Sequence, residues 1–139
     1  YYRYGEVVIA GAELAGGNAA ELYDSLVLNR NDYNIVLLHG QTEKYRSAEK
    51  AETIDLPALK NKNIDYLALG HIHSYRREPL DTRGCYCYCG CMEGRGFDEC
   101  GEKGFVWIEM EEKKAEVSFV PFAVRTVHEV QIFPEQRVH

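Results

Sequence analysis

The sequence predicts an α/β protein in which parallel strand–helix units are followed by a run of antiparallel strands. Three apolar runs of strand length, 6–14, 34–40 and 64–73, alternate with segments that have a helical pattern. From residue 84 onward, strand-like runs follow one another with only turn residues between them. Because the 139 residues contain no repeat and no visible domain boundary, we expect a single domain over 1–139.

The first strand–helix unit begins with the short apolar run EVVIAGAEL (6–14). Asn18 is followed three residues later by Glu21, a spacing that predicts a capping box at the start of a helix. The apolar side chains expected on one face of this helix are Leu22, Leu26 and Val27.

The second unit begins with NIVLLHG (34–40), a continuous apolar run of strand length. The polar segment 41–53 has no clear period and is expected to be a loop. Asp55 is predicted to cap a short helix that tolerates Pro57 in its first turn. IDYLALGHIH (64–73) is the third strand, so the order of elements predicts right-handed crossovers and a mostly parallel sheet.

The rest of the chain is predicted to form consecutive antiparallel strands, because strand-like runs there are separated only by turns. These runs are GCYCYCG (84–90), KGFVWIEMEE (103–112), KKAEVSFVPF (113–122) and RTVHEVQIF (125–133).

Composition excludes several classes of protein. The net charge of −6 argues against a general nucleic-acid clamp, which would be basic. No apolar run approaches the roughly 20 residues of a membrane span, so no membrane partner is expected. The first residues lack a signal-peptide pattern, and five cysteines without such a signal predict reduced thiols in a cytoplasmic protein.

Histidines follow two of the predicted strands at their carboxyl ends. His39 ends the second strand, and His71 and His73 end the third. Ligands of open α/β sheets bind beyond the carboxyl ends of the strands, so these three side chains are expected to converge. Imidazole suits zinc, manganese and iron, and Gly70 would let the backbone turn tightly beside such an ion. An isolated histidine at a strand end is otherwise an ordinary polar loop residue.

The cysteine-rich run is a rival metal site. Its spacing is Cys-x-Cys-x-Cys-Gly-Cys, whereas zinc sites usually contain Cys-x-x-Cys. In a strand, Cys85, Cys87 and Cys89 share one face and the intervening tyrosines take the other. We therefore favour a buried strand with small apolar thiols; zinc binding or a redox role stays open, with Cys91 and Cys100 as exposed thiols.

The glycine-rich turn EGRGFDE after this strand offers further polar groups. Arg95 is a candidate for contacting a substrate phosphate, although it could equally be a solvent-exposed turn residue. Glu93, Asp98 and Glu99 could orient ligating histidines, but carboxylates in such turns more often lie on the surface.

Taken in order, VLLHG, LALGHIH and YCYCGCMEGRGFDECGEKGFVWIEM resemble the calcineurin-like metallophosphoesterase superfamily, in its DNA repair exonuclease branch. The resemblance extends from Glu6 to about Ile132. It implies part of a four-layer αββα sandwich and two-metal hydrolysis of a phosphodiester, with DNA as a candidate substrate. By the same resemblance His39 and His71 would bind one divalent ion and His73 the other, the ions being manganese, zinc or iron.

The resemblance also implies motifs that this chain lacks. Family members carry an Asp-x-His, a Gly-Asp whose carboxylate bridges the metals, and a Gly-Asn-His; here the one Gly-Asn, at Gly17, is followed by alanine. Since the chain begins at Tyr1, we expect it to be the C-terminal portion of such a domain. It would then hold metal partly or not at all and hydrolyse little by itself, with no catalytic residue assigned beyond the ligands.

Two other functions remain as alternatives. A half domain would expose a sheet face that attracts partners, which predicts a non-catalytic assembly module and a homodimer through the truncated face. A cysteine-ligated structural metal protein would instead lose zinc when Cys87 or Cys89 is changed to serine, yet be insensitive to His71→Ala.

Overall fold

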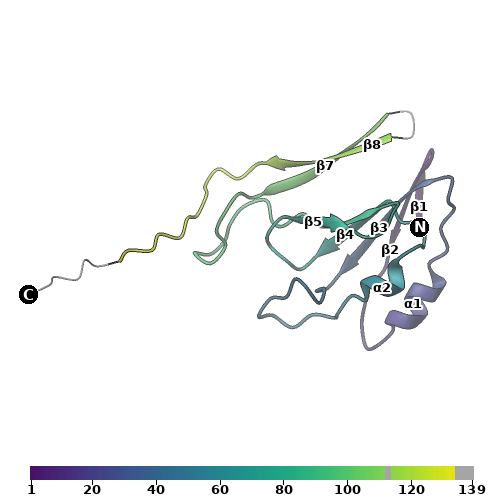
Figure 1. The fold of residues 1–139 in the computed structure, drawn as a ribbon, viewed down its shortest axis with the longest axis horizontal. Helices are drawn as coiled ribbons and strands as arrows, with labels where there is room; N and C mark the ends of the chain where they lie inside the picture. Colours follow the sequence, from purple (N-terminus) through teal and green to yellow (C-terminus); the bar gives the residue numbers. More distant parts are fainter. Residues whose placement is uncertain (112–113, 134–139) are drawn as a thin grey trace, which may run out of the picture.

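The computed structural model describes residues 1–111 and 114–133. A six-stranded sheet in the order β1-β2-β3-β4-β6-β5 is accompanied by a separate two-stranded sheet, β7–β8. Helices α1 (Ala19–Ser25) and α2 (Leu56–Leu59) lie on one side of the large sheet, and the β7–β8 hairpin lies on the other (Figure 1). The strands are β1 (Tyr2–Tyr4), β2 (Val7–Gly11), β3 (Tyr33–His39), β4 (Tyr66–Gly70), β5 (Arg76–Pro79), β6 (Cys85–Tyr88), β7 (Gly104–Glu111) and β8 (Lys114–Pro121).

The predicted α/β class, and with it the four-layer αββα sandwich, is wrong. In the part of the chain that the structure describes, helix is confined to the seven residues of α1 and the four of α2, and the protein is mostly β. One sparse helical layer covers a mixed sheet, and a hairpin forms the small second sheet. The crossover segments have too few apolar positions at helical spacing to build the outer helical layers that a four-layer sandwich requires.

The centre of the large sheet is parallel, because each strand from β2 to β4 returns to the same edge through a crossover. β2 pairs in parallel with β3, and β3 with β4.

The Asp55 side chain accepts a hydrogen bond from the Ala58 amide at the start of α2, as the sequence predicted. The predicted capping box at α1 does not form. Asn18 instead accepts from the Ala15 amide and donates to the Glu13 carbonyl, each at 3.0 Å, and so closes the turn before the helix.

The later strands depart from the predicted antiparallel run. β6 pairs in parallel with β4 and antiparallel with β5, a strand that the sequence did not predict. The β7–β8 hairpin is antiparallel, as predicted. The segment 125–133 is not a strand, apart from one bridge between Gly101 and Val127, because it has no neighbouring strand edge to pair with over its length.

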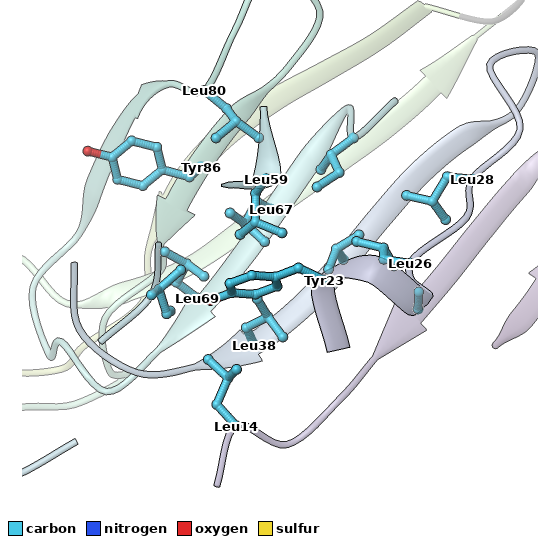
Figure 2. Packing of buried hydrophobic residues seen from close by; sticks show 14 of the residues in the cluster. Leu14, Tyr23, Leu26, Leu28, Leu38, Leu59, Leu67, Leu69, Leu80 and Tyr86 are labelled. Carbon is cyan, nitrogen blue, oxygen red and sulfur yellow. The ribbon is translucent and has the colours of Figure 1, made fainter. Parts of the chain in front are cut away.

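The main core lies between the large sheet and the two helices. Figure 2 shows its side chains gathered around Tyr23 of α1, which is 4% exposed. Val27 does not join this core and is 81% exposed, because α1 ends at Ser25 and the chain turns away. The core residues contributed by the sheet are Val8, Ala10, Val36, Leu38, Leu67, Leu69, Tyr86 and Tyr88.

No helix among the described residues has the length and apolar character needed to cross a membrane.

The cysteine-rich strand separates its two kinds of side chain, as the strand interpretation predicted. Tyr86 and Tyr88 pack in the main core, whereas Cys85 and Cys87 point to the side of the sheet that carries the β7–β8 hairpin. Burial raises the pKa of Cys87 to about 11, so this thiol stays protonated and behaves as a small apolar group. All five cysteines are free, and Cys89 is exposed.

Candidate metal site at the strand ends

The parallel register brings two of the predicted histidines together. His39, the last residue of β3, pairs with Gly70, the last residue of β4, so that His71 follows directly beside it. The rings of His39 and His71 lie edge to face, with their centroids 5.4 Å apart and their planes at 73°. Adjacent parallel strands that end at the same level therefore place these two imidazoles at one sheet edge.

Two glycines make room for the His39 ring and for the turn that follows it. A Cβ on Gly70 would lie 2.8 Å from Nδ1 of His39, so a larger residue would displace the ring. A Cβ on Gly40 would lie 2.6 Å from the carbonyl oxygen of Glu52, which belongs to the following loop. The hydroxyl of Tyr88 donates to the Gly40 carbonyl at 2.9 Å, which anchors this turn to β6 from inside the core.

The backbone at His71 is held in an unfavourable conformation. Its φ is 101°, a region that residues with a Cβ rarely adopt. Such a conformation costs about 1–3 kcal/mol and persists where the surrounding structure enforces it, which is common at functional sites. The strained backbone therefore marks His71 as a candidate functional residue.

The loop 41–53 supplies a partner for the His71 ring. Oγ of Ser47 lies 2.7 Å from Nε2 of His71 and forms a hydrogen bond with it. If this hydroxyl accepts the Nε2–H, then Nδ1 of His71 carries the free lone pair that a metal requires. The sequence identified this segment only as a loop, and nothing in its pattern indicated that Ser47 would reach the histidine.

The third predicted histidine belongs to a different cluster. Nδ1 of His73 lies 2.5 Å from Oε1 of Glu99, and Sγ of Cys91 lies 3.9 Å from Oε2 of the same carboxylate. One ligand atom from each of His73, Cys91 and Glu99 falls within 4.8 Å of the others, a grouping that could hold a metal ion. Across residues 1–111 and 114–133 this is the one such group of three or more, and neither His39 nor His71 belongs to it.

Backbone and lysine contacts fix this cluster in place. The Arg95 amide donates to Oε2 of Glu99 at 2.6 Å; this bond, reinforced by His73, lowers the pKa of Glu99 and keeps the carboxylate charged. Nζ of Lys103 donates to the carbonyl oxygen of His73 at 2.8 Å, and Lys103 is only 3% exposed. Burial raises the pKa of Cys91, whose thiol points at the same His73 carbonyl.

His71 and His73 face a shared hollow of about 500 Å³. Arg95, the predicted phosphate contact, lies on its wall, as do Arg46 and Lys103, so three cations face three acidic side chains and the two imidazoles. His39 lines a neighbouring hollow of about 500 Å³ formed with Glu13, Leu14, Lys50, Ala51 and Glu52. The structure thus brings His39 to His71, and His71 to the same hollow as His73 and Arg95.

The sequence pointed to the three histidines but to only part of their surroundings. Glu99 was recognised as a residue that could orient a histidine, and it does contact His73. Cys91 was seen as an exposed thiol, yet it is half-buried beside the same pair. Lys103 was missed, because a lysine that opens a strand gives no sign in sequence that its ammonium group turns inward.

No family model matches this chain, and a search of curated proteins finds no match either.

Proposed function

We propose that this chain carries part of the site of a metal-dependent phosphoesterase that acts on phosphodiesters, DNA among them. The observation that supports this most strongly is the meeting of the His39 and His71 rings at the ends of neighbouring parallel strands, 5.4 Å apart. The strained backbone at His71 and the space left by Gly70 both serve this arrangement. These features have no evident packing purpose, since both rings lie outside the apolar core.

The types of donor atom suit divalent metal ions. His39 and His71 offer two imidazoles to one ion, and His73 with its carboxylate and thiol neighbours offers ligands to a second. Manganese, zinc or iron bound there would activate water and stabilise charge on the phosphoryl oxygens. Because the bridging carboxylate motif of the family that the sequence resembles is missing, we expect no more than partial occupancy of the two-ion site in this chain.

The chain's own residues would bind and orient the substrate. Arg46, Arg95 and Lys103 line the hollow beside His71 and His73, and guanidinium groups bind phosphate oxygens through paired N–H donors. Ser47 would keep the His71 ring in one orientation and tautomer. Five free cysteines accord with a reducing, cytoplasmic location, which forms part of the same proposal.

The test measures manganese-dependent hydrolysis of bis-p-nitrophenyl phosphate by this chain, alone and within any longer natural protein that contains it. By itself the chain is expected to stay near the uncatalysed rate. Within a protein that supplies the missing motifs, hydrolysis is expected, with kcat/KM falling about 100-fold or more in His71→Ala because a metal ligand is lost. His128→Ala is the matched control, since His128 is exposed and lies in none of these contacts.

Two results would overturn the proposal. One is the absence of hydrolysis with manganese, zinc and iron both in this chain and in any longer natural protein that contains it. The other is hydrolysis that His71→Ala leaves unchanged while circular dichroism reports a folded variant.

A second candidate function is an assembly module, favoured by the sheet face opposite the helices. Leu37 on this face is 44% exposed, and Val7, Ile9, Ile35 and Ala68 beside it are only half-buried. An apolar sheet surface of this kind is a typical protein contact.

Light scattering on the purified chain tests this function. A homodimer is expected, and Leu37→Glu should weaken it by about 10-fold or more because a charge would be buried at the contact. Val27→Glu is the control, since Val27 is even more exposed but lies away from this face. A strictly monomeric wild-type chain at high concentration would rule out the homodimer.

A further inference from the structure

We propose that His73, Cys91 and Glu99 form a single three-ligand site for a zinc-type ion, with a fourth position open to the neighbouring hollow. This inference does not depend on phosphoesterase activity. It assigns a thiolate ligand and a carboxylate ligand that the strand-end motifs alone did not identify.

The ligand atoms lie close enough together to bind one ion after small side-chain movements. Around a tetrahedral zinc with bonds of about 2.0–2.3 Å, neighbouring ligand atoms lie roughly 3.3–3.8 Å apart. Here Nδ1 of His73 and Oε1 of Glu99 are 2.5 Å apart, and Sγ of Cys91 is 3.9 Å from Oε2 of Glu99. No pair exceeds 4.8 Å, so side-chain adjustments of about an ångström would bring all three atoms to one ion.

The backbone holds the three residues together before any ion binds. Gly90 has a φ of 78°, and a Cβ there would lie 3.1 Å from the His73 carbonyl oxygen, so this glycine lets Cys91 approach His73 closely. The Gly104 amide donates to the Cys91 carbonyl at 3.1 Å, which ties the turn to the start of β7. Together with the Lys103 contact to His73, these bonds make the site preorganised, which favours binding.

The choice of donors selects the metal. A thiolate with an imidazole and a carboxylate favours zinc over manganese or magnesium, because soft sulfur ligands suit zinc and hard oxygen ligands suit the others. The Arg95 amide bond to Glu99 orients the carboxylate in the way that outer contacts commonly support metal ligands.

The open position would take an anionic oxygen ligand. Three protein ligands plus one exchangeable ligand is the usual arrangement of zinc ions that bind substrates. His73 and Glu99 line the hollow of about 500 Å³ that also contains Arg95 and Lys103, whose charges would attract such an anion.

Zinc binding by the purified chain, measured in competition with a chromogenic chelator, tests this assignment. One zinc per chain is expected, with affinity falling about 100-fold or more in Cys91→Ser because a metal ligand is removed. Cys89→Ser is the matched control, since Cys89 lies two residues away but is exposed and outside the cluster. Cobalt in place of zinc should give a thiolate charge-transfer band in wild type and Cys89→Ser, but not in Cys91→Ser.

A measurement on the unchanged chain covers the case in which Cys91→Ser does not fold. Zinc is expected to slow alkylation of Cys91 at least about 10-fold, as read by peptide mass spectrometry, while Cys89 and Cys100 react at unchanged rates. Equal alkylation of Cys91 with and without zinc would overturn the proposal and leave only a His73–Glu99 ion pair. Cys91-dependent zinc binding in a protein without esterase activity would uphold it and count against the phosphoesterase instead.

Discussion

Replacing Gly70 with alanine is expected to separate the His39 and His71 rings while leaving the fold intact. The added Cβ would lie 2.8 Å from Nδ1 of His39, too close for the present ring position. His39 is exposed, so its ring can swing outward at little cost in free energy of unfolding. The pair that supports the metal proposal would then be lost without damage to the core.

Three measurements report the effect of Gly70→Ala. Resonances of the His39 and His71 rings should shift in the nuclear magnetic resonance spectrum, whereas those of His128 should not. The proposed manganese-dependent hydrolysis should fall about 10- to 100-fold, the usual cost of misplacing a metal ligand. The melting temperature should stay within about 3 °C of the original value, which corresponds to less than roughly 1 kcal/mol.

Gly11→Ala is the control for this experiment. Gly11 ends β2, and its added Cβ would meet only Leu37, at an ordinary contact distance of 3.9 Å. Unchanged His39 and His71 resonances in Gly70→Ala, or equal shifts in Gly11→Ala, would show that Gly70 does not make room for the ring.

Replacing Gly84 with alanine is expected to have the opposite effect and to damage the fold itself. A Cβ there would lie 2.1 Å from the Ile64 carbonyl oxygen and 2.7 Å from that of Asp65. These are backbone atoms, and the Asp65 carbonyl already accepts the Cys85 amide that starts the pairing of β6 with β4. Since neither oxygen can rotate away, the strands must separate to admit the methyl group.

Urea unfolding of Gly84→Ala should report a loss of at least about 3 kcal/mol, at the upper end for overpacking of a close contact. Gly11→Ala again serves as the control and should cost less than about 1 kcal/mol. A Gly84→Ala chain as stable as the original would mean that β6 does not approach the Ile64–Asp65 backbone closely enough to exclude a methyl group.

The sequence predicted those parts of the fold that depend on neighbouring residues. The apolar runs around 34–40 and 64–73 became the adjacent parallel strands β3 and β4, and Asp55 caps its helix as expected. The αββα layers were wrong because they came from the resemblance and not from helical periodicity in this chain. β5 was missed because RREP is charged and ends in proline, which is not a typical strand pattern. This segment becomes a strand because it pairs with β6.

For the candidate site, too, the sequence could predict some features, and others depend on the tertiary structure. Histidines at the ends of two apolar strands could be recognised from the sequence, because alternating strands and crossovers bring the carboxyl ends of parallel strands to one edge. The sequence could not predict which partner each histidine side chain contacts. His39 faces His71, whereas His73 turns to Glu99 and Cys91, 26 and 18 positions further along the chain.

By itself, then, the sequence determined that this protein has a parallel strand core, a buried cysteine–tyrosine strand and imidazoles at one sheet edge, since local periodicity and strand order fix these. Only the tertiary structure decided which imidazole meets which partner. That depends on the path of the turn from Gly90 to Lys103, which is held by contacts to His73 and Cys91. Long-range hydrogen bonds of this kind leave no periodic trace in a sequence.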